Sequence, residues 1–498
     1  MDYFYSISYG FSIAFQPMNL VYCFWGVLVG NLIGVLPGIG PVGTMALLLP
    51  FTMGASPIAG VIMFAGIFYG AMYGGSITSI LVNIPGEAAT VVTCLDGYQM
   101  ARQGRAGPAL GIAAFGSFIS GTISVIGLMF LANPLANFAL SFGPSEYFGI
   151  MCLGLILVIY MSRGSTIKGL ITALAGFIIS QIGRDAIYSV PRFTFGFREL
   201  DEGLSIVPVV MGLLGISEVL INLEQSVDVS VYKTRIKNLL PDLKDWAASI
   251  GSIFRGTIIG FLLGVLPGGG PIISSFASYA VEKKKSKHPE QFGHGAIEGV
   301  AGPEAANNSA IAGGFVPLFS LGIPSNVVMA LLLAAFMIHG MQPGPLLLRN
   351  HPEMFWGTVA SMYLGNIMLL LINIPLIGMW VQLLKIPYRI LFPLILVLML
   401  IGGYSFNSST FDLYVMLIFG IVGYLFRKFD FEPTPLILAF ILGTMMENNF
   451  RLSLVMSGGD FSIFLRPIPA LAFGIGLVLI LSEVLPFVKK FRTKIPEE

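Results

Sequence analysis

Apolar windows of about 20 residues recur from one end of this 498-residue chain to the other. Examples are 112–130, 204–223, 355–376 and 471–488. As a helix, each window is long enough to cross a hydrocarbon core of about 30 Å. The chain is 55% hydrophobic and only 11% charged, whereas soluble domains carry roughly 25% charged residues. We therefore expect an all-α polytopic membrane protein with about 10–12 spanning helices and additional re-entrant hairpins.

Two of the apolar runs carry nearly the same interruption. "GVLPGIGP" at 34–41 and "GVLPGGGP" at 264–271 agree in seven of eight positions and lie 230 residues apart. Proline removes a backbone donor and glycine loosens the chain, so each stretch should break a helix. A second pair, "NIPGE" at 83–87 and "GIPSN" at 322–326, aligns at an offset of 239. These ordered matches predict an internal duplication.

The duplication divides the chain into three parts. We expect a first repeat over 1–221 with a hairpin break at 34–41, and a second repeat over 250–498 with a hairpin break at 264–271. A charged connector at 222–249 separates them. The connector shares one side of the membrane with Arg102, Arg105, Arg163 and Lys168, where basic residues dominate, so we place it in the cytoplasm.

Basic residues also give the orientation of the two halves, because cytoplasmic ends of membrane helices collect lysine and arginine. On this rule Lys168 and Arg427 mark cytoplasmic ends. The loop at 107–108 then lies inside, and its repeat mate at 344–345 lies outside. The halves are therefore predicted to be inverted, as in many secondary transporters.

The residues of the two breaks predict a binding site. If each break is the tip of a re-entrant hairpin, its irregular backbone must line a wet cavity or be buried in protein. After Pro271 a new helix can start, and its free N–H groups attract anions. The alternative is that these residues only kink two helices for packing. The candidate substrate-binding residues at the tips are Gly38, Gly40, Pro41, Val42, Gly43, Thr44, Gly268, Gly269, Gly270, Ile272, Ile273 and Ser274.

The two Ile-Pro breaks add further candidates. Asn83, Ser325 and Asn326 offer neutral donors and acceptors suited to carboxylate oxygens or to a sodium ion. Their alternative role is to cap the following helix, and the two roles are compatible. The substrate-binding candidates in these breaks are Asn83, Pro85, Gly86, Pro324, Ser325 and Asn326.

A few acids and amides occur near apolar segments, where an ionisable group is a functional candidate. These groups could carry the coupling ion, or they could be helix-start residues at the membrane interface. The coupling-ion candidates are Glu87, Asp96, Glu304, Asn307 and Asn308. No metal site beyond a sodium ion is suggested.

Enzymatic motifs are missing from the sequence. It has no GxxxxGK[ST] phosphate loop, no GxSxG, no HExxH and no paired Cys/His set. Its three cysteines lie far apart, and its net charge of +1 gives no sign of nucleic-acid binding. We expect neither an enzyme nor an organic cofactor.

The long motifs resemble those of the large membrane subunit of the tripartite tricarboxylate transporters. The stretches that carry the resemblance are "GVLPGIGPVGTMALLLPFT", "GVLPGGGPIISSFASYAVEK", "GHGAIEGVAGPEAANNSA" and "LGIPSN". The resemblance implies a multi-pass protein of the bacterial cytoplasmic (inner) membrane. It also implies a small partner membrane subunit of four helices, a periplasmic solute-binding protein that delivers an organic acid, and symport with sodium or protons.

The sequence thus predicts secondary-active uptake of a di- or tricarboxylate anion, citrate-like in chemistry, by alternating access. The hairpin tips and the two Ile-Pro breaks would form one site at the middle of the membrane. Two alternatives remain open at this stage. One is a passive anion channel, and the other is a membrane scaffold or sensor that binds substrate without moving it.

Overall fold

A computed structural model describes residues 3–36, 40–52, 54–162, 165–185, 187–224, 239–383 and 388–484. These residues are almost entirely helical. The one sheet among them is a small antiparallel ribbon, in which β1 (Gly183–Arg184) pairs with β2 (Pro191–Arg192). The α-helices are α1 (Tyr3–Ala14), α2 (Pro17–Val35), α3 (Gly40–Thr52), α4 (Pro57–Val82), α5 (Val91–Arg102), α6 (Ala106–Ala139), α7 (Pro144–Met161), α8 (Thr166–Ser180), α9 (Ile206–Val210), α10 (Ser217–Glu224), α11 (Leu243–Val265), α12 (Gly270–Lys285), α13 (Glu298–Leu321), α14 (Val327–Ile338), α15 (Pro345–Asn350), α16 (Pro352–Asn373), α17 (Ile377–Leu383), α18 (Tyr388–Asn407), α19 (Thr410–Lys428), α20 (Thr434–Met456) and α21 (Pro467–Val484).

Five short helical segments complete the described chain. A π-helix, η3 (Met211–Ile216), joins α9 to α10 without a break. The four 3₁₀ segments are η1 (Ala88–Thr90), η2 (Arg198–Leu200), η4 (Pro289–Gln291) and η5 (Phe461–Leu465).

Length and composition confirm the predicted class. Among the described residues, seven helices are long and apolar enough to cross a membrane: α2, α4, α6, α7, α11, α16 and α19. Six shorter apolar helices accompany them. The chain is therefore an all-α polytopic membrane protein, while the predicted number of spans stays a prediction. In α4 the most apolar window is 94% buried inside the protein, so this helix lies at the centre of the fold.

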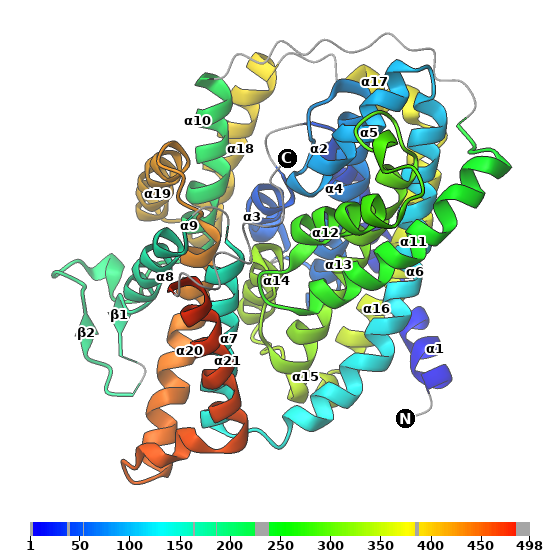
Figure 1. The fold of residues 1–498 in the computed structure, drawn as a ribbon. Coiled ribbons are helices and arrows are strands. Elements are labelled where there is room, and N and C mark those ends of the chain that lie inside the picture. Colours follow the sequence, from blue (N-terminus) through cyan, green and yellow to red (C-terminus); the bar gives the residue numbers. More distant parts are fainter. Residues whose placement is uncertain are drawn as a thin grey trace.

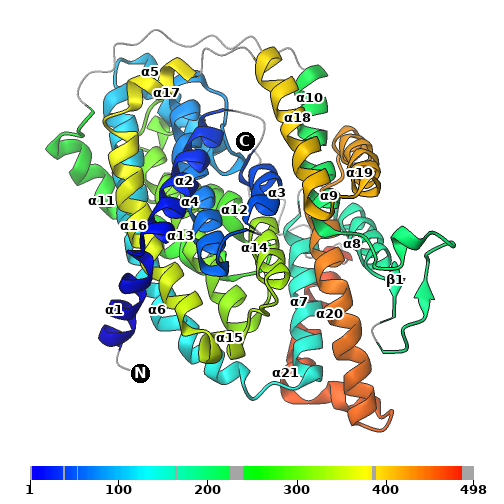
Figure 2. The same ribbon diagram turned by 180° about the vertical axis from the view of Figure 1, so that it is seen from behind.

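The helices form two groups in space (Figures 1 and 2). One group contains α1, α2, α4, α6, α11, α13 and α16, with α12 and α13 near its centre. The other contains α7, α8, α19, α20 and α21, and the β1–β2 ribbon projects from its outer side. Helices α3 and α14 lie between the two groups and contact each other.

The sequence repeat has a counterpart in helix packing. In each half, three glycines one helical turn apart press against backbone carbonyls of a later helix, so that a Cβ added to any of them would overlap the carbonyl oxygen. The pairs are Gly26 with Met63, Gly30 with Ile67 and Gly34 with Ala71 between α2 and α4, and Gly256 with Gly302, Gly260 with Ala306 and Gly264 with Ala310 between α11 and α13. Adding 230 to the first glycines and 239 to their partners gives the second set (26 + 230 = 256; 63 + 239 = 302). The two sequence offsets thus describe one helix pair built twice.

This close packing gives a first testable prediction. Gly30→Val should destabilise the protein by about 1–3 kcal/mol or more, because the side chain has no room against Ile67 and must displace α4. Thermal unfolding in detergent measures the effect. Gly474→Val in α21 is the matched control, since a Cβ at Gly474 meets no atom within 4 Å. Equal melting temperatures for the two variants would contradict the packing argument.

Both predicted breaks interrupt helices. Helix α2 ends at Val35 and α3 begins at Gly40, while α11 ends at Val265 and α12 begins at Gly270. The residues that follow the first helix of each pair, Leu36 and Leu266, are both extended. These helix ends lie at equivalent positions of the repeat, 230 residues apart. Whether the two hairpins enter the membrane from opposite faces stays a prediction, as do the proposed repeat boundaries.

Candidate functional site

A cavity of about 870 Å³ lies where the two helix groups meet. Its volume is in the range of about 300–1,000 Å³ that is usual for small-molecule sites. From the first group and the segments between the groups it is lined by Phe68, Met72, Val42, Glu87, Ala88, Gly268, Gly269, Gly270, Pro271, Ile272, Ile273, Asn326, Val327 and Val328. From the second group it is lined by Val158, Met161, Ser162, Lys168, Leu214, Arg427, Asp430, Phe431, Glu432, Pro433 and Thr434. The second hairpin tip, both Ile-Pro breaks and one residue of the first hairpin therefore meet at one cavity.

The tip between α11 and α12 depends on its glycines. Gly268 and Gly270 have φ values of +82° and +44°, which side-chain-bearing residues rarely adopt. The turned backbone lets the N–H of Gly268 donate a 2.8 Å hydrogen bond to the carbonyl oxygen of Ser325. This bond ties the second hairpin tip to the second Ile-Pro break. The two duplicated motifs are thus one structural unit in the second half.

Gly40 begins α3 and Gly270 begins α12, and each of them faces the last residue of the Ile-Pro break in its own half. A Cβ built on Gly40, whose φ is +63°, would lie 3.3 Å from Oε2 of Glu87. A Cβ built on Gly270 would lie 3.8 Å from Cβ of Asn326. Gly40 and Gly270 are repeat mates at an offset of 230, and Glu87 and Asn326 are mates at 239. The site therefore has the same construction in both halves, with a carboxylate on one side and an amide on the other.

The hydroxyl groups of Thr44 and Ser274 are also equivalent. Thr44 Oγ1 donates to the carbonyl oxygen of Gly40 at 2.8 Å, and Ser274 Oγ donates to that of Gly270 at 2.7 Å. Both side chains are buried and neither lines the cavity. In this arrangement they stabilise the first turns of α3 and α12.

Several helices begin at the cavity wall. Helix α12 starts at Gly270, α14 at Val327 and η1 at Ala88, and all three residues line the cavity. Helix α3 starts at Gly40 and contributes Val42. The first N–H groups of a helix have no intrahelical acceptor, and the start of a helix carries roughly half a positive charge. In α14 the Asn326 side chain accepts from the N–H of Met329 at 3.1 Å, and Val327 and Val328, the first two residues of the helix, line the cavity. At η1 the carboxylate of Glu87 already caps the first turn, so the helix starts without an acidic cap at this wall are those of α12, α14 and α3.

Only some of the predicted substrate-binding residues line the cavity. The predicted residues that line the cavity are Val42, Glu87, Gly268, Gly269, Gly270, Ile272, Ile273 and Asn326. The other predicted residues do not line the cavity. Those in the first turns of α3 and α12 are Gly40, Pro41, Gly43, Thr44 and Ser274, and those in the two Ile-Pro breaks are Asn83, Pro85, Gly86, Pro324 and Ser325. Asn83 is exposed and ends α4 in the left-handed conformation at φ 59°, as its repeat mate Gly322 ends α13 at φ 70°. Gly38 lies outside the described residues.

The cavity also contains two cations that sequence reasoning assigned only to the membrane boundary. Lys168 Nζ donates to the carbonyl oxygen of Phe429 at 2.7 Å and lies 5.2 Å from the ring centre of Phe431. Arg427 forms an ion pair with Glu218. Both line the second-group wall, near Asp430 and Glu432. Their positive charge was visible in the sequence, but only the packing of α8 against the α19–α20 connection shows that they face a cavity.

Glu304 lies at the centre of a buried polar cluster rather than at the cavity. Its carboxylate contacts the hydroxyl of Ser76 (Oγ to Oε2, 2.6 Å), the hydroxyl of Thr93, and the amide of Asn307 (Nδ2 to Oε2, 3.2 Å). The amide of Asn308 donates to Oδ1 of Asn307 at 2.7 Å. All five side chains are at most 4% exposed. The structure thus brings three coupling-ion candidates together, on the shared boundary of α4, α5 and α13.

Asp96 holds a loop in place. Its Oδ1 accepts from the backbone N–H groups of Gly293, Gly295 and Ala296 at 2.8–2.9 Å, and its Oδ2 accepts from the Tyr279 hydroxyl at 3.0 Å. It is fully buried and does not line the cavity. This geometry fits a clamp between α5 and the segment that precedes α13.

Asp96→Asn tests that assignment. Because the neutral amide accepts these bonds less strongly, we expect a loss of about 1.5–3 kcal/mol in the free energy of unfolding. Limited proteolysis should also cut the segment 286–296 faster. Tyr279→Phe removes one of the four bonds and serves as the graded comparison, with a loss of about 0.5–1.5 kcal/mol. Unchanged stability and proteolysis in Asp96→Asn would contradict the clamp.

Comparison with known proteins agrees with this architecture. Residues 20–438 match the model of the tripartite tricarboxylate transporter TctA family. A protein of Agrobacterium vitis, described as an uncharacterized 52.8 kDa protein in the TAR-I ttuC' 3' region, is 48% identical over 496 residues, which is 99% of each chain. A second A. vitis protein, from the TAR-II ttuC' 3' region, is 49% identical over 237 residues, 47% of this chain and 98% of its own length. No solved structure matches the chain. The chain therefore belongs to the tripartite tricarboxylate transporter TctA family.

Proposed function

We propose that this chain is the translocating subunit of a secondary-active importer of di- or tricarboxylate anions. The observation that carries the proposal is the cavity between the two helix groups, where α12, α14, η1 and α3 begin. The first amides of a helix have no intrahelical acceptor and attract negative charge. On the opposite wall Lys168, which among the described residues is hydrogen-bonded only to a backbone carbonyl, supplies positive charge for an outer carboxylate of a citrate-like anion, whereas Arg427 is paired with Glu218.

The position of the cavity supports alternating access. Its two walls come from different helix groups, so a displacement of one group against the other would open the site to one side and close it to the other. The duplicated α2–α4 and α11–α13 pairs are held by close glycine contacts and would move as one body. In this proposal the two halves are inverted repeats, and a coupling ion, sodium or a proton, binds with the substrate.

The proposal includes the rest of the transport system. A small four-helix membrane subunit would accompany this chain in the bacterial inner membrane, and a periplasmic solute-binding protein would deliver the carboxylate. Membership in a tripartite transporter family supports this part of the proposal. The exposed apolar side chains of α8, α19 and α21 provide the surface that contacts lipid or the small subunit.

Counterflow in proteoliposomes tests the proposed function. The chain is reconstituted with both partners, loaded with unlabelled citrate and supplied with labelled citrate at zero gradient. A carrier accumulates label transiently by exchange, and an imposed ion gradient then drives net accumulation. Through a passive anion channel the label would equilibrate at a rate that unlabelled citrate inside the vesicles does not increase. A scaffold or sensor would bind citrate without any flux. Either of these results would overturn the proposal.

A further inference from the structure

Glu304 is a buried carboxyl group without a cationic partner. Among the described residues, no lysine, arginine or histidine forms an ion pair with it. The titratable groups that face it are Tyr73 of α4 and Cys94 of α5, and both are neutral in their ordinary forms. A charge in such an environment is costly unless it is paired, hydrogen-bonded or neutralised by a proton. The protein must therefore have a reason to keep an acid at this position.

The hydrogen bonds around Glu304 can accommodate both its ionised and its protonated form while all heavy atoms stay in place. Ser76 Oγ lies 2.6 Å from Glu304 Oε2 and 2.9 Å from the carbonyl oxygen of Met72. A hydroxyl has only one hydrogen and can donate to one of these acceptors at a time. When Glu304 is ionised, Ser76 can donate its hydrogen to the carboxylate. If Ser76 donates to Met72, its oxygen can accept a hydrogen from a protonated Glu304.

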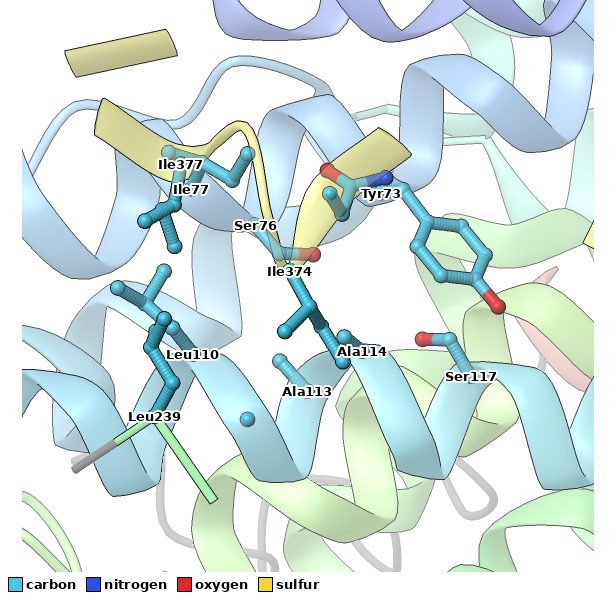
Figure 3. Close-up of a pocket in the computed structure, with 12 residues that line it drawn as sticks. Tyr73, Ser76, Ile77, Leu110, Ala113, Ala114, Ser117, Leu239, Ile374 and Ile377 are labelled. Carbon is cyan, nitrogen blue, oxygen red and sulfur yellow. The ribbon is translucent and has the colours of Figure 1, made fainter. Parts of the chain in front are cut away.

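A pocket the size of one water molecule adjoins this switch (Figure 3). It has a volume of about 20 Å³ and is lined by Ser76, Tyr73, Ser117 and Asn373 together with apolar side chains. A cavity needs roughly 10–15 Å³ and two to four polar partners to hold a water. The Tyr73 hydroxyl and Asn373 Oδ1 have no hydrogen-bond partner within the described ranges, so they are available to such a water. Ser76, the residue that exchanges its bond with Glu304, lines the same pocket.

The position of Glu304 connects this chemistry to the transport site. Glu304 belongs to α13, which leads to the second Ile-Pro break at 322–326. Ser76 belongs to α4 and Thr93 to α5, which flank the first Ile-Pro break. A proton gained or lost at Glu304 thus changes the bonds between the helices that carry both breaks. This is a suitable place for a coupling ion to act.

We propose that Glu304 is the proton-carrying residue of the transport cycle, and that Ser76 reorients its hydroxyl as the proton comes and goes. This proposal rests on the proposed carboxylate transport. In the loading step a hydronium ion gives its proton to the Glu304 carboxylate and leaves a water, and Ser76 turns from Glu304 to the Met72 carbonyl. The release step is the reverse.

The test uses the reconstituted complex with a pH-sensitive dye inside the vesicles and the membrane potential clamped at zero. In the wild type, citrate addition should acidify the lumen, and a gradient of about one pH unit should drive about tenfold accumulation per coupled proton. Glu304→Gln should give no acidification and no accumulation above equilibration, and Ser76→Ala should shift the pH of half-maximal uptake. Ser309→Ala is the matched control, because this buried serine of α13 donates to the Thr257 carbonyl instead.

Two results would overturn the proton assignment. One is accumulation that depends on a sodium gradient and ignores the pH gradient. The other is unchanged acidification in Glu304→Gln. Infrared titration of the purified complex tests the assignment independently of transport, because one protonated-carboxyl band of the wild type should be missing in Glu304→Gln while the bands of the other acids remain. An identical set of bands in the two proteins would refute the proposal. A chain that moves no carboxylate would instead refute the proposed function.

Discussion

Gly270→Val should abolish carboxylate uptake while the chain still inserts into the membrane. At φ +44° a β-branched side chain is strained, which costs about 1–3 kcal/mol. The new Cβ would point at Asn326, 3.8 Å away, so the two further methyl groups would enter the space between α12 and the start of α14. The amides that face the cavity would then no longer converge. Uptake of labelled citrate, normalised to the amount of protein in the membrane, measures the effect.

The repeat provides an independent copy of the same experiment. Gly40→Val should have the same effect, because Gly40 has φ +63° and its Cβ would lie 3.3 Å from Glu87. Gly104→Val is the matched control: its φ of +80° imposes similar strain, but a Cβ there meets no atom within 4 Å and the residue does not line the cavity. Full uptake by Gly40→Val and Gly270→Val would contradict the proposed site. Loss of uptake in Gly104→Val would show that backbone strain alone is responsible.

Lys168→Gln should raise the KM for a tricarboxylate about tenfold, which corresponds to about 1.4 kcal/mol of lost binding energy. Lys168 lines the cavity, and its ammonium group uses one hydrogen for the carbonyl oxygen of Phe429 and has others for a carboxylate. The effect should be larger for a tricarboxylate than for a dicarboxylate, because the third charge would lose its partner. Uptake kinetics with both classes of substrate measure it.

Lys428→Gln is the comparison for charge. Lys428 follows Arg427 directly, but it pairs with Glu224 and does not line the cavity. Its replacement should leave the KM within a factor of about two. Equal effects of Lys168→Gln and Lys428→Gln would indicate a general surface potential rather than a specific contact.

Much of the architecture could be predicted from local sequence. Proline followed by glycines and a second proline at 37–41 and 267–271 disfavours continuous helix, so both breaks could be located in advance. The isolated prolines Pro134, Pro303 and Pro317 stay inside α6 and α13. The repeat offsets of 230 and 239 reappear in the contacts of Gly26, Gly30 and Gly34 and of their mates. Such features depend on backbone chemistry and on residue size, which a sequence states directly.

Other features depend on contacts between distant segments. Nothing local to Lys168 reveals that it lies beside Phe429, 261 residues later. Asp96 looks like a buried functional acid until its four donors from α12 and residues 293–296 are seen. Asn83 has the chemistry of a ligand, but its left-handed backbone conformation gives it the role of a helix C-cap. In each case the residue type could be read from the sequence, but its contacts or its backbone conformation could not.

A density map of the complete transporter in lipid, with a tricarboxylate bound, tests the central claim most directly. We predict ligand density in the cavity, with carboxylate oxygens near the amides of Gly270 and Ile272 at the start of α12 and of Val327 and Val328 at the start of α14. The hairpin tips at 36–41 and 266–271 should lie at the middle of the bilayer and enter from opposite faces. Ligand density elsewhere, or tips exposed at the lipid surface, would contradict the account.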